Sequence, residues 1–84
     1  VSFFGYPNPT NGTYSLNYGM SSGDEVTLEI IDHIGKIILT KDLGSQSSGL
    51  HSEKLDMQQY AEGLYFIRLN TSSGSKMLRV NLVK

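Results

Sequence analysis

Apolar and polar residues alternate along much of this chain. The clearest alternating runs are residues 13–18, 26–31, 63–69 and 76–84. A period of two places the apolar side chains on one face of an extended strand, so each run predicts a half-buried β-strand. The last two runs are separated only by a short polar segment that contains Gly74. We therefore expect a hairpin at the C-terminal end of the sequence.

Segments rich in Gly, Ser, Asn and Pro separate these runs and predict turns. A turn at Gly35 should join the strand at residues 26–31 to a strand at residues 36–40. Residues 42–49 predict a mobile loop, because this stretch is rich in Ser and Gly. Two further elements are expected before Gly63: a weaker strand at residues 50–55 and a helical turn at residues 56–62.

Six or seven short strands at this spacing predict an all-β fold. The most consistent architecture is a single immunoglobulin-like antiparallel β-sandwich of about seven strands, and a small barrel is the alternative. The 84 residues form one expected domain, with residues 6–84 as the sandwich and residues 1–5 as a linker remnant or first strand. The start at Val1, without an initiator Met, suggests a chain cut from a longer one.

The charges divide the chain into an acidic body and a basic end. All eight acidic residues lie in residues 1–62, whereas residues 63–84 contain four basic residues and no acid. A net charge of −1 argues against nucleic acid as a partner, since such domains carry a dense basic face. We find no apolar run long enough to span a bilayer and no secretory signal at the start of the sequence.

The residue types needed for catalysis or metal binding do not form a recognisable pattern. The chain has no Cys, and neither His33 nor His51 has a second ligand at a metal-motif spacing, so both are expected in turns or on the surface. No Ser lies in a nucleophile-elbow context. We therefore expect no enzyme activity, no cofactor and no metal.

The chain has five tyrosines, which could form a sugar-stacking platform: Tyr6, Tyr14, Tyr18, Tyr60 and Tyr65. Those that lie in the alternating runs are expected in the core.

Four blocks of sequence occur in a recognisable order. They are Tyr6 to Gly12, with its Pro-Asn-Pro; Ile31 to Lys36; Leu55 to Met57 leading to Gly63 to Leu69; and Lys76 to Lys84. Together they resemble the type A C-terminal sorting domain of the type IX secretion system. The resemblance covers essentially the whole chain, and the ordered set is more specific than any block alone.

This resemblance implies a non-catalytic secretion signal. Such a domain directs an N-terminal cargo protein through the outer-membrane translocon of a Gram-negative bacterium, and a sortase-like protease then cleaves the domain off. The protein would pass through the periplasm and reach the outer-membrane surface or the medium. Weak self-association through exposed strands is a further expectation.

The resemblance also transfers motif residues to this sequence, for most of which we expect a structural role. They are Pro7, Asn8, Pro9, Gly12, Asp32, Gly35, Gly63 and Tyr65. The candidates for recognition by the secretion machinery are Lys76, Arg79 and Lys84, together with the backbone edge of the final strand. Two readings remain beside this one: a small immunoglobulin-like accessory domain that binds carbohydrate or a protein partner, and a structural spacer.

Overall fold

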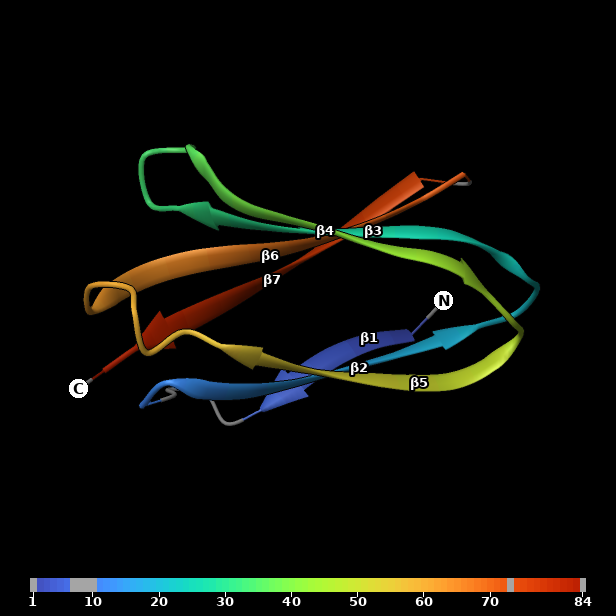
Figure 1. Ribbon diagram of the computed structural model, residues 1–84, viewed down its shortest axis with the longest axis horizontal. Helices are drawn as coiled ribbons and strands as arrows, with labels where there is room; N and C mark the ends of the chain where they lie inside the picture. Colours follow the sequence, from blue (N-terminus) through green and yellow to red (C-terminus); the bar gives the residue numbers. More distant parts are fainter. Residues whose placement is uncertain (1, 7–10, 73, 84) are drawn as a thin grey trace.

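The computed structural model describes residues 2–6, 11–72 and 74–83, which form seven strands and no helix (Figure 1). The strands are β1 (Ser2–Tyr6), β2 (Thr13–Met20), β3 (Asp24–Asp32), β4 (Ile37–Gln46), β5 (Gly49–Asp56), β6 (Gly63–Thr71) and β7 (Gly74–Leu82).

The seven strands form two antiparallel sheets that pack face to face as two layers (Figure 1). One sheet has the order β1-β2-β5, and the other has the order β4-β3-β6-β7. Consecutive strands pair within a sheet, except where the chain crosses between layers after β2, β4 and β5. The prediction of an all-β sandwich with about seven strands is confirmed.

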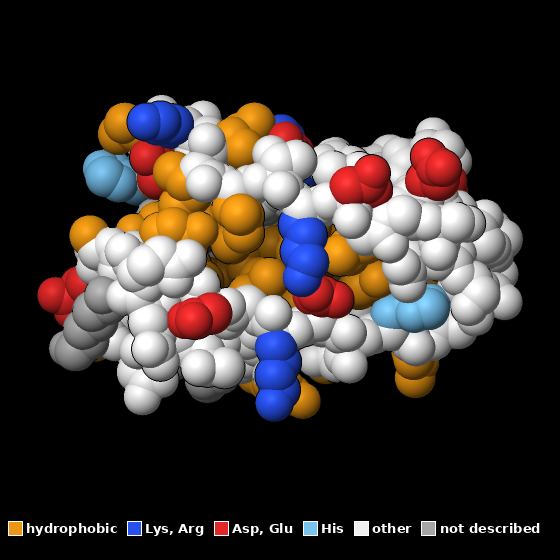
Figure 2. Space-filling view, in the orientation of Figure 1, with side chains coloured by type: hydrophobic (Ala, Val, Ile, Leu, Met, Phe, Trp, Pro, Cys, Tyr) orange, Lys and Arg blue, Asp and Glu red, His pale blue; other side chains and the backbone are white. Residues whose placement is uncertain are grey.

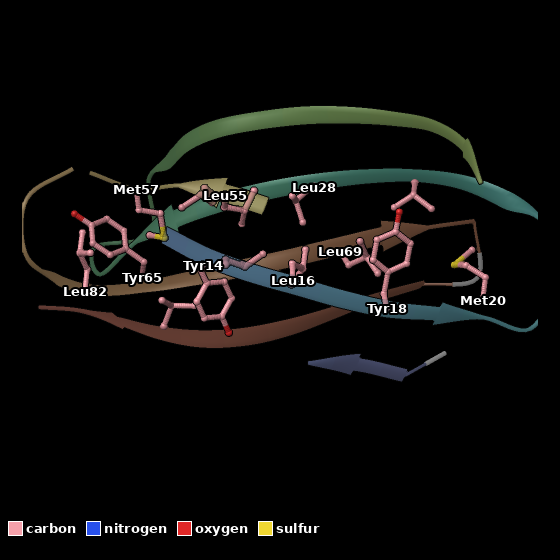
Figure 3. Packing of buried hydrophobic residues seen from close by; sticks show 14 residues of the cluster. Tyr14, Leu16, Tyr18, Met20, Leu28, Leu55, Met57, Tyr65, Leu69 and Leu82 are labelled. Atoms are coloured by element: carbon pink, nitrogen blue, oxygen red, sulfur yellow. The ribbon is translucent and has the colours of Figure 1, made fainter. Parts of the chain in front are cut away.

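The core lies between the inward faces of the two sheets, as alternation requires (Figure 3). Its fully buried side chains come from both layers, and Met57 closes one end from the connection after β5. The largest of them are Tyr14, Leu16, Leu28, Ile30, Met57, Ile67, Leu69 and Leu82. Because these side chains span the space between the sheets, the apolar core holds the layers together without a disulfide.

One predicted element differs from the structure. Residues 42–49 were expected as a loop, but β4 continues to Gln46 and β5 begins at Gly49. Residues of this segment pair with the start of β3, for example Gly44 with Val26 and Gln46 with Asp24. Backbone pairing with β3 orders this segment, and the partly buried Leu43 packs against the core. The loop prediction was therefore wrong for most of its length.

Residues 57–62 connect β5 to β6 and contain a turn. The Tyr60 N–H donates to the Met57 carbonyl oxygen at 3.1 Å, which closes a single turn. The residues predicted as a helical turn, 56–62, are too few to form a stable helix unless tertiary packing supports it. The segment instead carries Met57 into the core and leads to the start of β6.

Candidate functional site

The C-terminal strand β7 lies at the end of the four-stranded sheet, where β6 is its partner. Its pairing runs without interruption from Gly63 opposite Leu82 to Thr71 opposite Gly74. Val80 and Leu82 are 0% exposed and fix one face of the strand in the core. This strand is the edge that the sequence identified as the candidate for recognition.

The hairpin connection determines which way the backbone of β7 points. Thr71 and Gly74 flank a two-residue connection, and such a flanking pair has its backbone groups facing each other. Alternation along the strand then directs the N–H and C=O of Met77 away from β6. Met77 is also 51% exposed, so its backbone groups point away from β6 in the plane of the sheet and its side chain is accessible to solvent.

The two described candidate charges, Lys76 and Arg79, are both exposed but lie on opposite faces of β7. Lys76 pairs with the inward core residue Leu69, while Arg79 pairs with Phe66 on the outward face. Residues three apart in a strand always divide in this way. The structure therefore places one positive charge on each side of the edge. Lys84 lies outside the described residues.

A third basic residue of the C-terminal segment, Arg68, belongs to an internal network. Its Nε lies 2.8 Å and its Nη2 2.7 Å from Glu29 Oε1, and Asn70 Nδ2 donates to the same oxygen at 2.7 Å. Hydrogen bonds from Asn70 and then Arg68 hold the pKa of the Glu29 carboxyl below its ordinary value. The charge of Arg68 on β6 is thus offset by Glu29 on the neighbouring strand β3.

A second contact between distant residues fixes the tip of the C-terminal hairpin. The backbone N–H and the hydroxyl of Ser72 donate to Asp24 Oδ2 at 3.1 and 2.6 Å. The hydroxyl hydrogen bond is the main reason why the pKa of Asp24 is lowered. Sequence reasoning missed this contact and the Glu29 network, because alternation reports which face a residue occupies and carries no signal for its partner across the sheet.

The turn at Asp32 is organised by its own carboxylate. Asp32 Oδ1 accepts from the N–H groups of Ile34 and Lys36 at 3.1 and 2.9 Å, and the Gly35 N–H donates to the Asp32 carbonyl oxygen at 3.0 Å. Gly35 has φ = 89°, a conformation that side chains with a Cβ rarely adopt. These two residues therefore shape the hairpin between β3 and β4.

The remaining motif residues lie where chain segments meet. Gly12 is buried, and a Cβ there would lie 2.5 Å from the Gln58 side chain. Gly63 begins β6 opposite Leu82. Tyr65 is buried, and its hydroxyl donates to the Ala61 carbonyl oxygen, a contact typical of the tyrosine corner in immunoglobulin-type sandwiches. Pro7, Asn8 and Pro9 lie outside the described residues.

The two histidines lie apart from each other. His33 is exposed in the turn after β3, whereas His51 lies within β5, where its ring stacks on Tyr18 with centroids 5.3 Å apart. Among the described residues, no group of three or more His, Cys, Asp or Glu side chains is placed to hold a metal ion. Tyr14, Tyr18 and Tyr65 are buried, so these three do not form a surface for sugar.

The fold is a small immunoglobulin-like β-sandwich, and its C-terminal edge strand β7 carries Lys76 and Arg79. Comparison with protein families gives a match to the secretion system C-terminal sorting domain over residues 5–83. The chain belongs to this family, the C-terminal sorting domains of type IX secretion. A search of curated proteins found no match. None of the described residues form a helix that is long and apolar enough to cross a membrane.

Proposed function

We propose that this domain directs a cargo protein, attached at its N-terminal side, from the periplasm across the outer membrane through the type IX translocon. A sortase-like protease then cleaves the domain from the cargo, which reaches the cell surface or the medium. The family match supports the sorting role. The domain acts by being recognised and carries out no chemistry of its own.

The observation that supports a mechanism is the uninterrupted pairing of the edge strand β7 with β6. A strand of the receptor that pairs with this edge would gain affinity through main-chain hydrogen bonds. Exposed Lys76 and Arg79 flank the edge on its two faces and would contribute selectivity through charge. With Lys84, these are the residues that we assign to recognition by the secretion machinery.

The edge can be tested without removing the strand. Deletion of residues 76–84 would also remove the buried Val80 and Leu82, so lost export would not separate recognition from folding. The substitution Met77→Pro separates recognition from folding, because Pro is tolerated on edge strands where the N–H points away from the neighbouring strand. It would block pairing with a receptor strand while the β6–β7 ladder stays intact. Met77→Leu, which keeps the N–H, is the matched control.

Both variants would be fused behind a periplasmic reporter in a bacterium with a type IX system. We expect the Met77→Leu fusion to reach the surface and the Met77→Pro fusion to remain in the periplasm, although circular dichroism shows both purified domains folded. Normal surface delivery of a folded Met77→Pro fusion would contradict the proposal. Replacing Lys76, Arg79 and Lys84 by Gln should preserve folding and reduce export. Comparing the mass of the mature parent protein with that of its precursor tests the cleavage step.

A further inference from the structure

The outer face of the three-stranded sheet carries two exposed aromatic side chains, Phe4 and Tyr6, both on β1. Phe4 lies opposite Asn17 of β2, and Tyr6 lies opposite Ser15. These two β2 residues alternate with the buried core residues of their strand, so both aromatic rings point away from the core. Each aromatic residue is 54% exposed. The fold has two layers, and no other described element covers this face (Figure 1).

The backbone between the two rings is held against the core. Gly5 faces inward, opposite Leu16, and the ring of the buried Tyr14 occupies the space that a Cβ at position 5 would need. Two residues along a strand span about 7 Å. Phe4 and Tyr6 therefore lie next to each other on one face at a spacing that the sheet fixes, as a preformed platform.

Polar side chains lie beside this platform in the same two rows of the sheet. The row of Phe4 continues through Asn17 on β2 to Ser52 on β5, and the row of Tyr6 continues through Ser15 to Lys54. The Nδ2 atom of Asn17 is shielded from solvent and has no hydrogen-bond partner among the described residues. Buried donors are nearly always paired in proteins, so this amide is a group that a ligand oxygen could satisfy.

We propose that this face binds a neutral polysaccharide chain whose sugar rings stack on Phe4 and Tyr6. The flat side of a pyranose ring exposes C–H groups, which fit the negative face of an aromatic ring. Its hydroxyl groups project from the rim, where Ser and Asn side chains can donate and accept hydrogen bonds. An extended polymer suits a flat platform, whereas a small ligand is usually held in a cavity. This binding is additional to the proposed sorting function and uses other residues.

Charge and composition favour a neutral sugar over other occupants of this face. Lys54 and Asp56 are its charged residues in the described part of the chain, and their charges balance. The face therefore lacks the excess positive charge that attracts nucleic acid or an anionic membrane. A protein interface has a contiguous apolar centre. Here, the polar and glycine positions of β2 separate the two aromatic rings from Leu50, the exposed apolar residue on β5.

Binding can be measured with the 84-residue chain itself. Cellohexaose, xylohexaose and mannohexaose would each be titrated into the isotope-labelled protein and followed by amide chemical shifts. We expect at least one of them to shift residues 4–6, 15–17 and 52–54. The dissociation constant should be roughly millimolar, because no cavity encloses the ligand.

Variants separate stacking from other contacts. Phe4→Ala and Tyr6→Ala should each weaken binding about tenfold, whereas Tyr6→Phe, which keeps the ring, should weaken it less. Ile34→Ala, which removes a side chain that is 75% exposed in a turn of the other sheet, is the matched control and should bind normally. Circular dichroism would check that each variant is folded.

Three results would overturn the inference: no shifts at this face with any of the three sugars, shifts centred on the four-stranded sheet, or unchanged binding by folded Phe4→Ala and Tyr6→Ala. A dimer in sedimentation velocity that Tyr6→Ala converts to a monomer would assign the face to a second copy instead. None of these results bears on export, which the Met77→Pro fusion tests separately.

Discussion

The two outer strands of the four-stranded sheet, β4 and β7, are similar in length, with ten and nine residues. Their edges differ. The pairing of β7 with β6 is continuous, whereas the pairing of β4 with β3 is interrupted twice, between Val26 and Thr27 and between Ile30 and Ile31. Such irregularities twist an edge strand and reduce its ability to pair with another chain.

Side chains also protect β4. Lys41 lies opposite the core residue Leu28, and it forms an ion pair with Glu53 on β5, which joins the two sheets. In the space-filling view, a basic and an acidic side chain meet over hydrophobic side chains between the two layers (Figure 2). Asp42 Oδ1 also accepts from the Gly44 N–H at 2.9 Å, which supports the local irregularity. A charge pointing inward at an edge is a known protection against strand addition.

The comparison shows a regular ladder at β7 and an interrupted one at β4, where an ion pair also links the strand to the other sheet. Both strands carry Lys, so composition alone does not separate them. The difference lies in whether the ladder is regular and in the ion pair that Lys41 forms with Glu53 on the other sheet. A domain that is recognised by strand addition needs one regular edge and protection of the other, because two regular edges would allow open-ended association.

The largest expected effect comes from removing a side chain that β7 buries in the core. Leu82→Ala should lower the free energy of unfolding by about 2–5 kcal/mol, because Leu82 is 0% exposed and its loss leaves a cavity. Leu39→Ala on β4, at a position that is 37% exposed, should cost less than about 1 kcal/mol. Urea denaturation of the two variants measures the difference. Equal losses would mean that β4 is held by the core as firmly as β7.

A smaller effect is expected when β4 loses its protection. Lys41→Leu removes the inward charge and the link to Glu53, so β4 should become more prone to strand addition. We expect a concentration-dependent dimer in sedimentation velocity and a change in unfolding free energy of less than about 1 kcal/mol. Lys36→Leu, at an exposed turn position, is the control. A monomeric Lys41→Leu variant would show that the irregular pairing of β4 with β3 is enough to prevent strand addition at β4.

The smallest expected effect concerns pH. The pKa of Glu29 is lowered in the folded state from its ordinary value of 4.5, so the unfolded chain binds more protons in the acid range. The stabilisation from Glu29 is present above pH 4.5 and is lost as the pH falls toward the folded pKa. In this acid range, we expect the free energy of unfolding of the Glu29→Gln variant to depend less on pH than that of the original protein. Urea denaturation at several pH values measures this dependence. An unchanged slope would contradict the role of the network between β3 and β6.

Much of the fold follows from local patterns. The runs that contain Tyr14, Leu28 and Ile67 predicted strands with one buried face, and these strands are present with those faces in the core. The turn at Gly35 was also predicted from its position between two such runs, and it lies there. Period-two alternation is a local property of the backbone, so a single sequence is enough to detect it. The part of β4 at residues 42–46 escaped detection, because its order depends on pairing with β3.

The prediction of function also has one part that came from the sequence and another part that needed the tertiary structure. The four ordered sequence blocks led from the sequence to the sorting-domain family, and the family match agrees. The roles of individual recognition residues stay predictions, and the tertiary structure adds where basic side chains of the C-terminal segment lie. It paired Arg68 with Glu29 and placed Lys76 and Arg79 on opposite faces of one strand.

The amino-acid sequence by itself determined that this chain forms short half-buried strands, that its core needs no cysteine and that its basic residues gather near the C-terminal end. Only the tertiary structure decided which strands lie at the sheet edges and which charges find partners. The physical reason is distance along the chain. A side chain's face depends on its immediate neighbours, whereas an edge or an ion pair is defined by which distant strand packs beside it.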